Sequence, residues 1–432
     1  MKQKEALAIL AAGHNVLLTG PAGSGKTFLL NQYIAHLKKE GIGAAITAST
    51  GIAATHIGGR TIHSWAGIGI KDRLSPGDIR ALTKRAYLKK QFAKTEVLII
   101  DEISMLHAHR LDMVNKVCQA FKKNSLPFGG IQVVMSGDFF QLPPISSGGE
   151  EAEFVYQADV WPEMDLRVCY LDEQHRQNDK KMTRILQSLR ENAVSPEIVG
   201  LLKGRMHQEP KADVRPVRLF THNVNVDAIN NAELGKIDAP EFNYRMTGEG
   251  EKKLVESLKK NCLVPENLVL KKGALVMFVK NKFKDEKVVY VNGTTGTVVG
   301  FGEDDFPIVR LNSGRDILAV PESWTIDNEE KILAKINQIP LRLAWAITVH
   351  KSQGMTLEAA EIDLSRSFGY GMGYVALSRL TSLAGLYLAG INDMAYKLDP
   401  RVAAYDRELL LLSERAEGDI KPKIFKKQGS LV

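Results

Sequence analysis

The residues from Gly20 to Thr27 have the spacing of a loop that binds phosphate groups. They read Gly-Pro-Ala-Gly-Ser-Gly-Lys-Thr and follow an apolar run, Val16 to Leu18, that is typical of a β-strand. Glycines let such a loop curl so that successive backbone N–H groups face an anion. The residues predicted to cradle phosphate in this way are Gly20, Gly23, Ser24 and Gly25.

Lys26 and Thr27 end this loop, and a helical pattern begins at Phe28. The positive N-terminal dipole of that helix adds to the attraction for an anion. We predict that Lys26 contacts the β- and γ-phosphates of ATP and that Thr27 contacts Mg²⁺. A chance match in a glycine-rich loop is the alternative interpretation.

Two adjacent carboxylates, Asp101 and Glu102, follow the apolar run Val97 to Ile100. An α/β sheet binds its ligands at the carboxyl ends of its strands, which is where these side chains fall. Asp101 is expected to hold Mg²⁺ through water, and Glu102 is expected to orient and deprotonate the attacking water. The alternative is a solvated strand end, because this pair is common by chance.

Gln141 lies in a third segment of this kind, Gly137 to Pro144, which follows the run Ile131 to Met135. A glutamine at a strand tip can donate a hydrogen bond to the γ-phosphate or the lytic water. It would then sense whether ATP has been cleaved. A proline-rich structural turn is the other interpretation.

Arg176 and Arg379 are candidates for arginine fingers, which stabilise the negative charge of a phosphoryl-transfer transition state. Arg176 lies where a first domain is predicted to end, and Arg379 lies in a helical pattern of a second domain. Most arginines are solvated surface residues, and that alternative holds for each of them.

Three polar loops carry side chains that suit contacts with a nucleic-acid backbone: Thr47 to Gly51, Gly58 to Trp65 and Thr348 to Gly354. Hydroxyls, lysine and backbone N–H groups bind phosphates without regard to base sequence. Trp65 and Phe140 are candidates for stacking on bases, against the alternative of core packing. His63 and His350 are candidates for the same surface, against the alternative of structural histidines.

Short apolar runs alternate with helical stretches, which is the pattern of parallel α/β sheets. The first series of expected strands is Asn15–Thr19, Ala44–Ala48, Val97–Ile100, Ile131–Met135 and Arg167–Leu171. The second series is Val217–Phe220, Leu275–Val279, Ala359–Leu364 and Gly385–Leu388. We therefore predict two tandem α/β domains, residues 1–173 and 174–432.

Each predicted domain has an insertion. Residues 66–95 are rich in Lys and Arg and are too long for an ordinary loop, so we expect a small subdomain there. Residues 282–338 have short strands around glycine turns, which predicts a small antiparallel barrel.

The 432-residue chain has a net charge of +7 and a pI near 9.0, a modest excess that suits a polyanionic partner and also suits ordinary solubility. Its three cysteines have no spacing typical of a disulfide framework or zinc site. No apolar run approaches the roughly 18 residues that a membrane span needs, and the N-terminus has no secretory pattern. We expect no membrane partner and a cytoplasmic, nucleoid-associated protein.

The order of the motifs resembles that of the Pif-one (petite integration frequency) helicases, in superfamily one subgroup B, which are related to the RecD-like helicases. The resemblance runs from Gln3 to about Ala389. Besides the phosphate loop and the Asp-Glu-Ile-Ser motif, it rests on Thr-Ala-Ser-Thr-Gly-Ile-Ala-Ala, Gly-Arg-Thr-Ile-His-Ser-Trp, Gly-Asp-Phe-Phe-Gln-Leu-Pro-Pro, Glu-Gln-His-Arg, Val-His-Lys-Ser-Gln-Gly and Tyr-Val-Ala-Leu-Ser-Arg.

The resemblance implies roles for individual residues. Gln3 matches the glutamine that reads adenine, and Gly354 is expected at the nucleotide as well. Lys26, Thr27, Asp101, Glu102, Gln141 and both arginines match the hydrolysis machinery. The residues expected at DNA are Thr50, Gly51, Thr61, His63, Trp65, Phe140, Thr348, His350, Lys351 and Ser352.

The fold that the resemblance implies has two tandem RecA-like P-loop domains with parallel sheets, a small wedge-type insertion in the first and an SH3-like β-barrel insertion in the second. The implied activity is that of a minimal bacterial or phage-type ATP-dependent helicase. It would move 5′ to 3′ on single-stranded DNA, with ATP and Mg²⁺, and open duplexes and forks. Many relatives also open G-quadruplex DNA and RNA–DNA hybrids and act in DNA repair, recombination and telomere maintenance. We expect a monomer in solution.

Two other functions are alternatives to the helicase. A P-loop kinase or ATPase switch predicts one α/β domain, and the second motif set and barrel speak against it. A DNA-binding protein with a degenerate ATP site predicts a loss among the hydrolysis residues, which are all present. DNA stimulation of ATP hydrolysis separates both alternatives from a helicase.

Overall fold

The computed structural model describes residues 1–69, 71–144, 153–177, 179–210, 215–221, 225–284, 287–327, 332–349 and 351–428. Contacts divide the chain into two units: Met1–His175 with Pro400–Val432, and Arg176–Asp399. The division falls two residues after the predicted boundary. The assignment of residues 400–432 to the second domain was wrong, because the C-terminal helix packs on the first unit.

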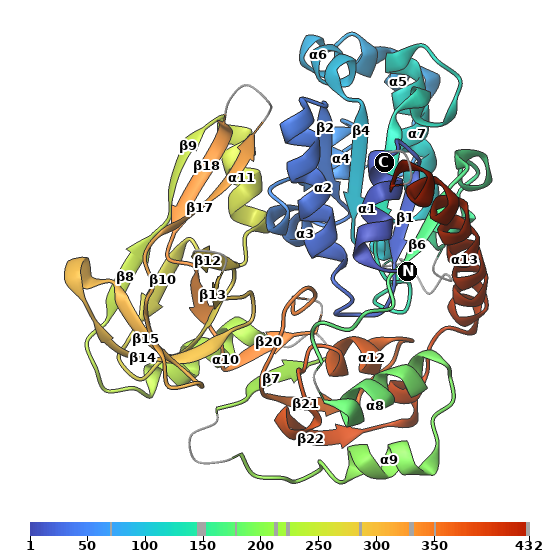
Figure 1. Cartoon of the computed structure of the whole chain (residues 1–432). Coiled ribbons are helices and arrows are strands. Elements are labelled where there is room, and N and C mark those ends of the chain that lie inside the picture. The colour runs from blue at the N-terminus through green and yellow to red at the C-terminus, as the bar shows by residue number, and fades with distance from the viewer. Residues whose placement is uncertain are drawn as a thin grey trace. The chain divides into compact units, whose positions relative to one another are not determined.

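Six described strands of the first unit form a parallel sheet in the order β3-β2-β4-β5-β1-β6 (Figure 1). Buried β-branched and aliphatic side chains favour extended backbone covered on both faces. All five strands predicted for this domain are present to within a residue at each end, and only the short β3 was missed. The strands are β1 (Val16–Thr19), β2 (Ala44–Ala48), β3 (Arg60–Thr61), β4 (Val97–Asp101), β5 (Gln132–Ser136) and β6 (Arg167–Tyr170).

Helices pack against this sheet through apolar stripes. The apolar faces of the first two helices form a core with β1, β4 and β5. The helices described before the C-terminal one are α1 (Gln3–Ala11), α2 (Lys26–Glu40), α3 (Gly51–His56), α4 (Ile62–Trp65), α5 (Pro76–Thr83), α6 (Ala86–Lys94) and α7 (Ala108–Lys122). Short 3₁₀ helices add η1 (Ile103–Met105), η2 (Pro127–Gly130), η3 (Val155–Gln157) and η4 (Trp161–Met164).

The predicted insertion at residues 66–95 forms the helical pair α5 and α6. Both helices contact α7 (Figure 1). Ser75 begins α5 with a capping box to Asp78, and Pro76 occupies the first helical position, where its missing N–H costs nothing. Leu82, Leu88 and Phe92 anchor the pair, so the rest of its surface is left to solvent.

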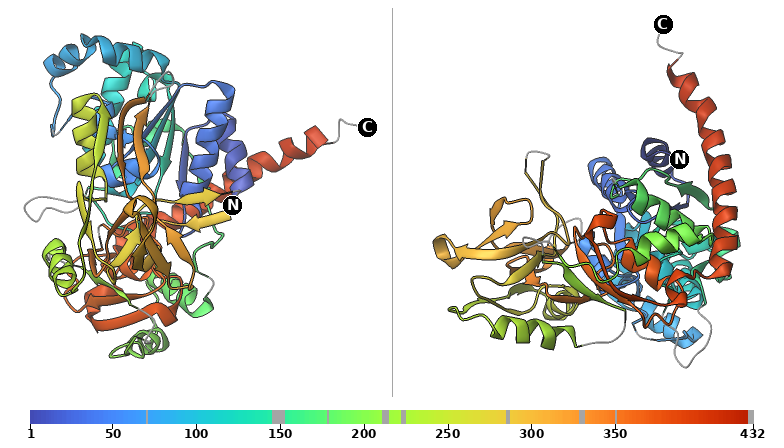
Figure 2. Two further views of the ribbon diagram at one scale, coloured as in Figure 1. Left: turned by 90° about the vertical axis from the view of Figure 1, so that its left-hand side faces the viewer. Right: turned by 90° about the horizontal axis from the view of Figure 1, so that it is seen from below.

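The long helix α13 (Pro400–Gln428) belongs to the first unit, where it contacts β6 (Figure 2). The Tyr170 N–H donates to Ser413 Oγ at 3.0 Å, and Trp161 Nε1 donates to the Tyr405 hydroxyl at 2.9 Å. The Tyr405 ring also stacks on Tyr156 with ring centroids 4.1 Å apart. These contacts attach the last helix to the first sheet, far from it in sequence.

The second unit has a parallel sheet whose described strands follow the order β20-β7-β21-β22. Its strands are β7 (Val217–Phe220), β20 (Ala346–Thr348), β21 (Ala360–Leu364) and β22 (Leu386–Ile391). Its helices are α8 (Lys180–Arg190), α9 (Pro196–Lys203), α10 (Val226–Gly235), α11 (Lys252–Asn261) and α12 (Met372–Leu377), with η6 (Leu383–Gly385) and η7 (Asp393–Tyr396). The fold is therefore two α/β domains with parallel sheets, as predicted.

Antiparallel sheets interrupt the second unit. The larger sheet has the order β16-β15-β14-β11-β19, and a smaller one has the order β17-β18-β9. The strands are β8 (Phe242–Arg245), β9 (Thr247–Gly250), β10 (Asn267–Leu270), β11 (Leu275–Phe278), β12 (Lys282–Lys284), β13 (Lys287–Tyr290), β14 (Thr295–Phe301), β15 (Pro307–Leu311), β16 (Asp316–Leu318), β17 (Glu322–Asp327), β18 (Ile332–Gln338) and β19 (Leu341–Leu343), with η5 (Glu303–Asp305).

One strand prediction in this region was wrong. The run Leu275–Val279 was assigned to the parallel series, but β11 pairs antiparallel with β14 and β19. A continuous apolar run fits either kind of buried strand, so its pattern alone does not choose between them. The antiparallel region is consequently wider than the predicted 282–338, since it begins at β8.

Within the described part of the chain, every helix is too short or too polar to span a membrane.

Candidate functional site

The loop between β1 and α2 has the geometry of a phosphate cradle. Gly20, Gly23 and Gly25 have φ angles of 137°, 87° and 86°, which turn the backbone as L side chains rarely allow. A methyl group at Gly20 would overlap the Leu171 carbonyl oxygen. Ser24 is fully buried, and in the described structure its hydroxyl has no hydrogen-bond partner. An unsatisfied hydroxyl beside the N–H groups at the start of a helix fits an oxyanion.

Lys26 lies within the curve of this loop. Its ammonium group donates hydrogen bonds to the carbonyl oxygens of Gly20 at 2.8 Å and Pro21 at 3.0 Å. Thr27 follows on the first turn of α2, with an exposed side chain. The cation and the hydroxyl are thus adjacent at the start of one helix, as nucleotide and Mg²⁺ binding require.

Asp101 ends β4 and is 6% exposed. Burial raises the pKa of its carboxyl, while the backbone N–H of Glu102, 2.9 Å from Oδ1, and the charge of Lys26 act in the opposite direction. A carboxylate that loses hydration here gains from a nearby cation. The donor set of Asp101 and Thr27, two oxygen ligands, therefore fits Mg²⁺.

Glu102 has φ 51° and ψ 47°, a left-handed conformation that costs a residue with a side chain about 1 kcal/mol or more. Its carbonyl oxygen accepts a hydrogen bond from Ser49 Oγ at 2.6 Å, and the Ser49 N–H donates to Asp101 O at 3.0 Å. The end of β2 thereby fixes the turn after β4. Strain held by such contacts is typical of functional positions.

Gln141 lies after β5 and is 6% exposed. Its backbone N–H donates to Asp138 O at 2.9 Å, and its amide Nε2 lies 3.5 Å from Asp138 Oδ2. Asp138 also accepts from the Phe140 N–H at 3.2 Å. Asp138 is thus a positioning residue for Gln141 that the sequence analysis did not single out, although it lies in the same motif.

Gln3 reaches the phosphate loop from α1. A methyl group at Gly25 would overlap Gln3 Nε2, which itself lies 3.3 Å from His175 Nε2. The His175 N–H donates to the Gly23 carbonyl oxygen at 3.0 Å. The structure therefore brings Gln3 to the loop, where the predicted adenine contact needs it, and adds His175, which the sequence analysis missed.

Except for Phe140, which follows β5, the predicted DNA residues of the first unit lie at or after the carboxyl ends of β2 and β3. Thr50 caps α3 by accepting the Ala53 N–H, and Thr61 caps α4 by accepting the Ser64 N–H, both at 3.3 Å. Gly51 is the first residue of α3. Their roles toward DNA stay predictions.

His63 is half-buried at the start of α4. Burial, together with the positive charges of Arg110, His107 and His109, lowers the pKa of His63 to about 4. Its imidazole is therefore neutral near pH 7, so it offers one donor and one acceptor rather than a positive charge.

The stacking predicted for Trp65 and Phe140 was wrong. The side chains are 1% and 3% exposed, and the Trp65 ring packs against Phe92 with ring centroids 4.7 Å apart. Aromatic rings lose too much apolar burial to leave such positions for a base. The alternative of core packing holds for both residues.

The two predicted arginine fingers lie side by side in the second unit. The Arg176 guanidinium donates to the Ser378 carbonyl oxygen at 3.1 Å. Arg379 is 1% exposed and donates to Val375 O at 3.0 Å and Ser378 Oγ at 2.8 Å. Arg176, which precedes α8, thus reaches the loop after α12 that carries Arg379, and two side chains that are distant in sequence both contact Ser378.

The third polar loop follows β20. Thr348 and Lys351 are half-buried, and the Lys351 N–H donates to Thr348 Oγ1 at 3.3 Å. Gly354 is exposed, with φ 77°. Ser352 is fully buried and donates to Val349 O at 2.8 Å, so its hydroxyl does not offer the predicted DNA contact. His350 lies outside the described residues.

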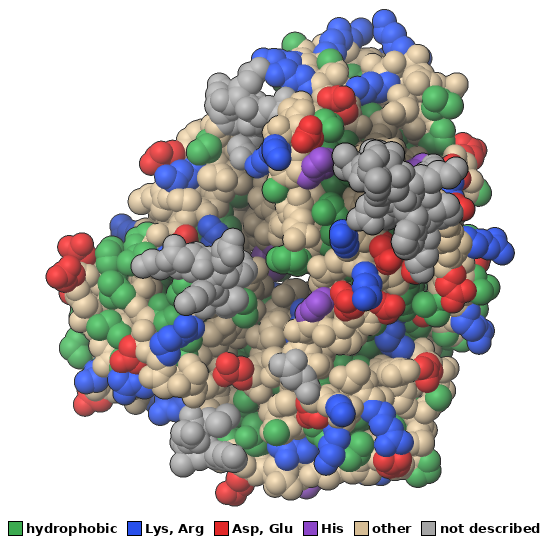
Figure 3. Space-filling model, in the orientation of Figure 1, with side chains coloured by type: hydrophobic (Ala, Val, Ile, Leu, Met, Phe, Trp, Pro, Cys, Tyr) green, Lys and Arg blue, Asp and Glu red, His purple; other side chains and the backbone are tan. Residues whose placement is uncertain are grey.

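Basic side chains concentrate on the insertion at residues 66–95, over α5 and α6 (Figure 3). This segment has eight Lys and Arg against two Asp. The eight basic residues are all exposed: Lys71, Arg73, Arg80, Lys84, Arg85, Lys89, Lys90 and Lys94. Tyr87, in the same segment, is 61% exposed. Most of the chain's net charge of +7 therefore comes from this one segment.

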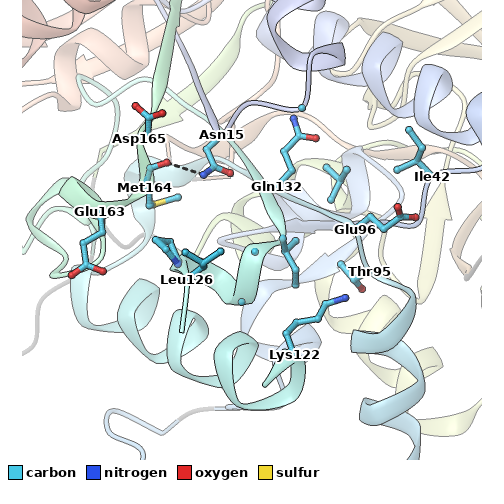
Figure 4. Close-up of a pocket in the computed structure, with 16 residues that line it drawn as sticks. Asn15, Ile42, Thr95, Glu96, Lys122, Leu126, Gln132, Glu163, Met164 and Asp165 are labelled. Atoms are coloured by element: carbon cyan, nitrogen blue, oxygen red, sulfur yellow. Dashed lines mark hydrogen bonds between the residues drawn. The ribbon is translucent and has the colours of Figure 1, made fainter. Parts of the chain in front are cut away.

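A cavity of about 630 Å³ in the first unit lies away from this chemistry (Figure 4). Its lining residues Glu96 and Gln132 stand at the amino ends of β4 and β5, opposite the edge that carries the phosphate loop. Asn15, also in the lining, donates to the Met164 carbonyl oxygen at 2.7 Å. Its side chain joins elements of the fold rather than offering itself to a ligand.

Comparison with known proteins gives the family. A model described as PIF1-like helicase matches residues 2–209, and one described as DNA helicase Pif1, 2B domain, matches residues 253–301. The chain is 45% identical to the ATP-dependent DNA helicase Pif1 of a Psychrobacter species, over 98% of this chain and 73% of that protein. The chain belongs to the PIF1-like helicase family. This helicase is accordingly an ATP-dependent enzyme that acts on DNA.

Solved structures agree with this assignment. The helicase matches a Bacteroides Pif1 in complex with ADP-AlF4 at a TM-score of 0.81 and 30% identity, covering 94% of this chain and 96% of that one. It matches a Bacteroides Pif1 bound to single-stranded DNA at a TM-score of 0.63 and 29% identity, covering 94% and 97%. The 2B-domain match runs from α11 to the end of β14, so it overlaps the predicted barrel only over residues 282–301.

Proposed function

We propose that this helicase uses ATP and Mg²⁺ to move 5′ to 3′ along single-stranded DNA and to open forked duplexes. The observation that carries the proposal is the convergence of Lys26, Asp101, Glu102 and Gln141 at the carboxyl edge of one sheet. The likeness to a Bacteroides Pif1 bound to single-stranded DNA supports single-stranded DNA as the track.

In the proposed hydrolysis, Lys26 and the loop N–H groups hold the phosphates, and Thr27 and Asp101 hold Mg²⁺. The bound Mg²⁺ would supply neutralising charge to the phosphate oxygens. Glu102 orients the attacking water and accepts its proton. Gln141, held by Asp138, contacts the γ-phosphate, and its loop changes when that phosphate leaves.

Arg176 and Arg379 stabilise the transition state in this proposal. Their shared contact with Ser378 supports a joint role, because a movement of the loop after α12 shifts both Arg379 and the carbonyl oxygen that Arg176 contacts. Removal of an arginine finger lowers kcat by about 10³-fold or more in other phosphoryl-transfer enzymes, with binding largely kept.

DNA contacts are proposed at Thr50, Gly51, Thr61 and His63 in the first unit and at Thr348, His350 and Lys351 in the second. The basic helices α5 and α6 are proposed to meet the duplex ahead of the single strand. Their phosphate contacts would make fork binding depend on salt. For each tenfold rise in salt concentration, the binding constant would fall by about one log unit per neutralised phosphate. G-quadruplex DNA and RNA–DNA hybrids are further proposed substrates, and a monomer is the proposed form in solution.

The deciding experiment compares two forks with the same duplex and opposite single-stranded tails. We expect unwinding of the fork with a 5′ tail and none of the fork with a 3′ tail. The Lys26→Ala variant should bind both forks and unwind neither, because it lacks the phosphate contact. Unwinding of the 3′-tailed fork alone would overturn the proposed polarity.

A further inference from the structure

Two histidines and a glutamate of the first unit bring their ligand atoms together away from the phosphate loop. The imidazole nitrogens of His107 and His109 and a carboxylate oxygen of Glu153 all lie within 4.8 Å of one another. His109 Nδ1 and Glu153 Oε2 are 2.9 Å apart. The two imidazole rings have centroids 5.2 Å apart and planes 35° apart.

The backbone holds this cluster in place. His107 is the N-cap residue of α7, and His109 is in the first turn of that helix. An antiparallel bridge pairs His107 with Phe154, which places Glu153 beside the helix start. Phe154 is buried and stacks on Tyr156 with ring centroids 5.3 Å apart, so the bridge rests on a packed core.

The basic side chains next to the cluster are either paired or neutral, so they would not repel a cation. Arg110 follows His109 on α7, and its guanidinium pairs with Asp72 at 2.6 Å, which offsets its charge. His63 faces the cluster from α4 and is neutral near pH 7. The exposed fractions of the His109 and Glu153 side chains are 39% and 49%, so solvent and ions reach them.

We propose that His107, His109 and Glu153 bind a divalent transition-metal ion of the Zn²⁺ class. Two imidazole nitrogens and one carboxylate oxygen are a donor set that Zn²⁺, Co²⁺ and Ni²⁺ accept, whereas Mg²⁺ prefers oxygen ligands throughout. Metal–ligand bonds of about 2.0–2.2 Å require donors roughly 3.3 Å apart. The three side chains would have to rotate to close that difference, and a water would complete four-coordination.

The site would fasten together two segments that carry the hydrolysis residues. His107 comes five residues after Glu102, and Glu153 comes twelve residues after Gln141. The ion would take the place of the direct contact between His109 and Glu153. Its expected role is structural, because the ligands lie apart from the phosphate loop.

The test uses the full chain without a polyhistidine tag and with the Cys262→Ser substitution, since Cys262 is the one cysteine of the sequence that is not fully buried. Excess Mg²⁺ occupies the ATP site while Co²⁺ is added and its visible absorption is followed. We expect one equivalent bound per chain. Zn²⁺ should displace it and raise the Tm of the first unit by at least about 4 °C.

Three single variants locate the site. His109→Gln and Glu153→Gln should each weaken Co²⁺ binding at least tenfold, and their circular dichroism should match that of the parent. The control is His14→Gln, which changes an exposed histidine elsewhere in the first unit and should bind as the parent does. Absence of binding to the parent, or unchanged affinity in both His109→Gln and Glu153→Gln, would overturn the proposal.

Discussion

Replacing Gly25 with alanine tests whether Gln3 lies against the phosphate loop. Gly25 has φ 86° and ψ 17°, and an alanine in this conformation costs about 1 kcal/mol. The added methyl would overlap Gln3 Nε2 and come within 3.1 Å of His175 Cδ2. Because the Gln3 amide is the end of a flexible side chain, it should swing away rather than unfold the loop.

The expected loss follows from these two contributions. The displaced amide gives up its contact with His175 and its proposed contact with adenine, worth about 1 kcal/mol together. Because ATP binding needs the loop in this conformation, whereas the free loop of the variant can relax from it, the backbone strain adds to the loss, and the total is about 2 kcal/mol. At one factor of ten per 1.36 kcal/mol, kcat/KM for ATP should fall about 30-fold. Steady-state ATP hydrolysis at saturating single-stranded DNA measures it.

Gly13→Ala is the matched control. Gly13 has φ 84°, and a methyl group there meets no described atom within 4 Å. That variant should lose about 1 kcal/mol of stability and keep its kinetics. In a Gln3→Ala background there is no Gln3 amide to displace. Only the backbone strain is then left, so Gly25→Ala should lower kcat/KM only about fivefold. An equal effect of Gly25→Ala in both backgrounds would refute the placement of Gln3.

Three further predictions follow from single contacts. Glu102→Gln should lower ATP hydrolysis by about 10²–10⁴-fold with ATP affinity kept, and single-turnover hydrolysis at the parent's rate would contradict its role as the base. Tyr405→Phe removes the hydrogen bond from Trp161 and should lower the free energy of unfolding in urea by about 1 kcal/mol. Tyr405→Ala also loses the ring stacking and should lower it by about 3 kcal/mol. Equal losses would show that the stacking contributes nothing. Burial lowers the pKa of His56 from 6.5 to about 4, so the unfolded chain binds a proton at this residue at a higher pH than the folded chain does. The contribution of His56 to stability should therefore be greatest above pH 6.5 and should fall toward pH 4, by at most about 3 kcal/mol. His56→Gln should flatten that decline, and an unchanged slope would exclude His56 as its source.

The sequence was sufficient for the first sheet because its strands are continuous apolar runs that end in chemically distinctive residues. Val97 to Ile100 followed by Asp101 predicts both a buried strand and its functional tip. The short β3 and β20 carry too few residues for any pattern. The place of α13 depends on Tyr405 and Ser413 meeting partners more than 200 residues away, which no local pattern records.

The residues of the candidate site also divide into those that the sequence predicts and those that it does not. Motif residues such as Lys26 and Gln141 were predictable, because their role fixes their type and spacing. Asp138 and His175 were not, because each acts by holding a neighbour in a geometry that only the folded chain defines. Trp65 shows the opposite error, since an aromatic residue in a polar motif has the same sequence appearance whether it faces DNA or the core.

The account's central claim is that ATP hydrolysis at the Gly20–Thr27 loop is coupled to single-stranded DNA. The most direct measurement is the rate of ATP hydrolysis with and without an oligonucleotide, for the parent chain and for Lys26→Ala. The account predicts at least tenfold stimulation of the parent by DNA and no hydrolysis by the variant, which should still bind the oligonucleotide. A parent rate that is indifferent to DNA, or a variant that still hydrolyses ATP, would contradict it.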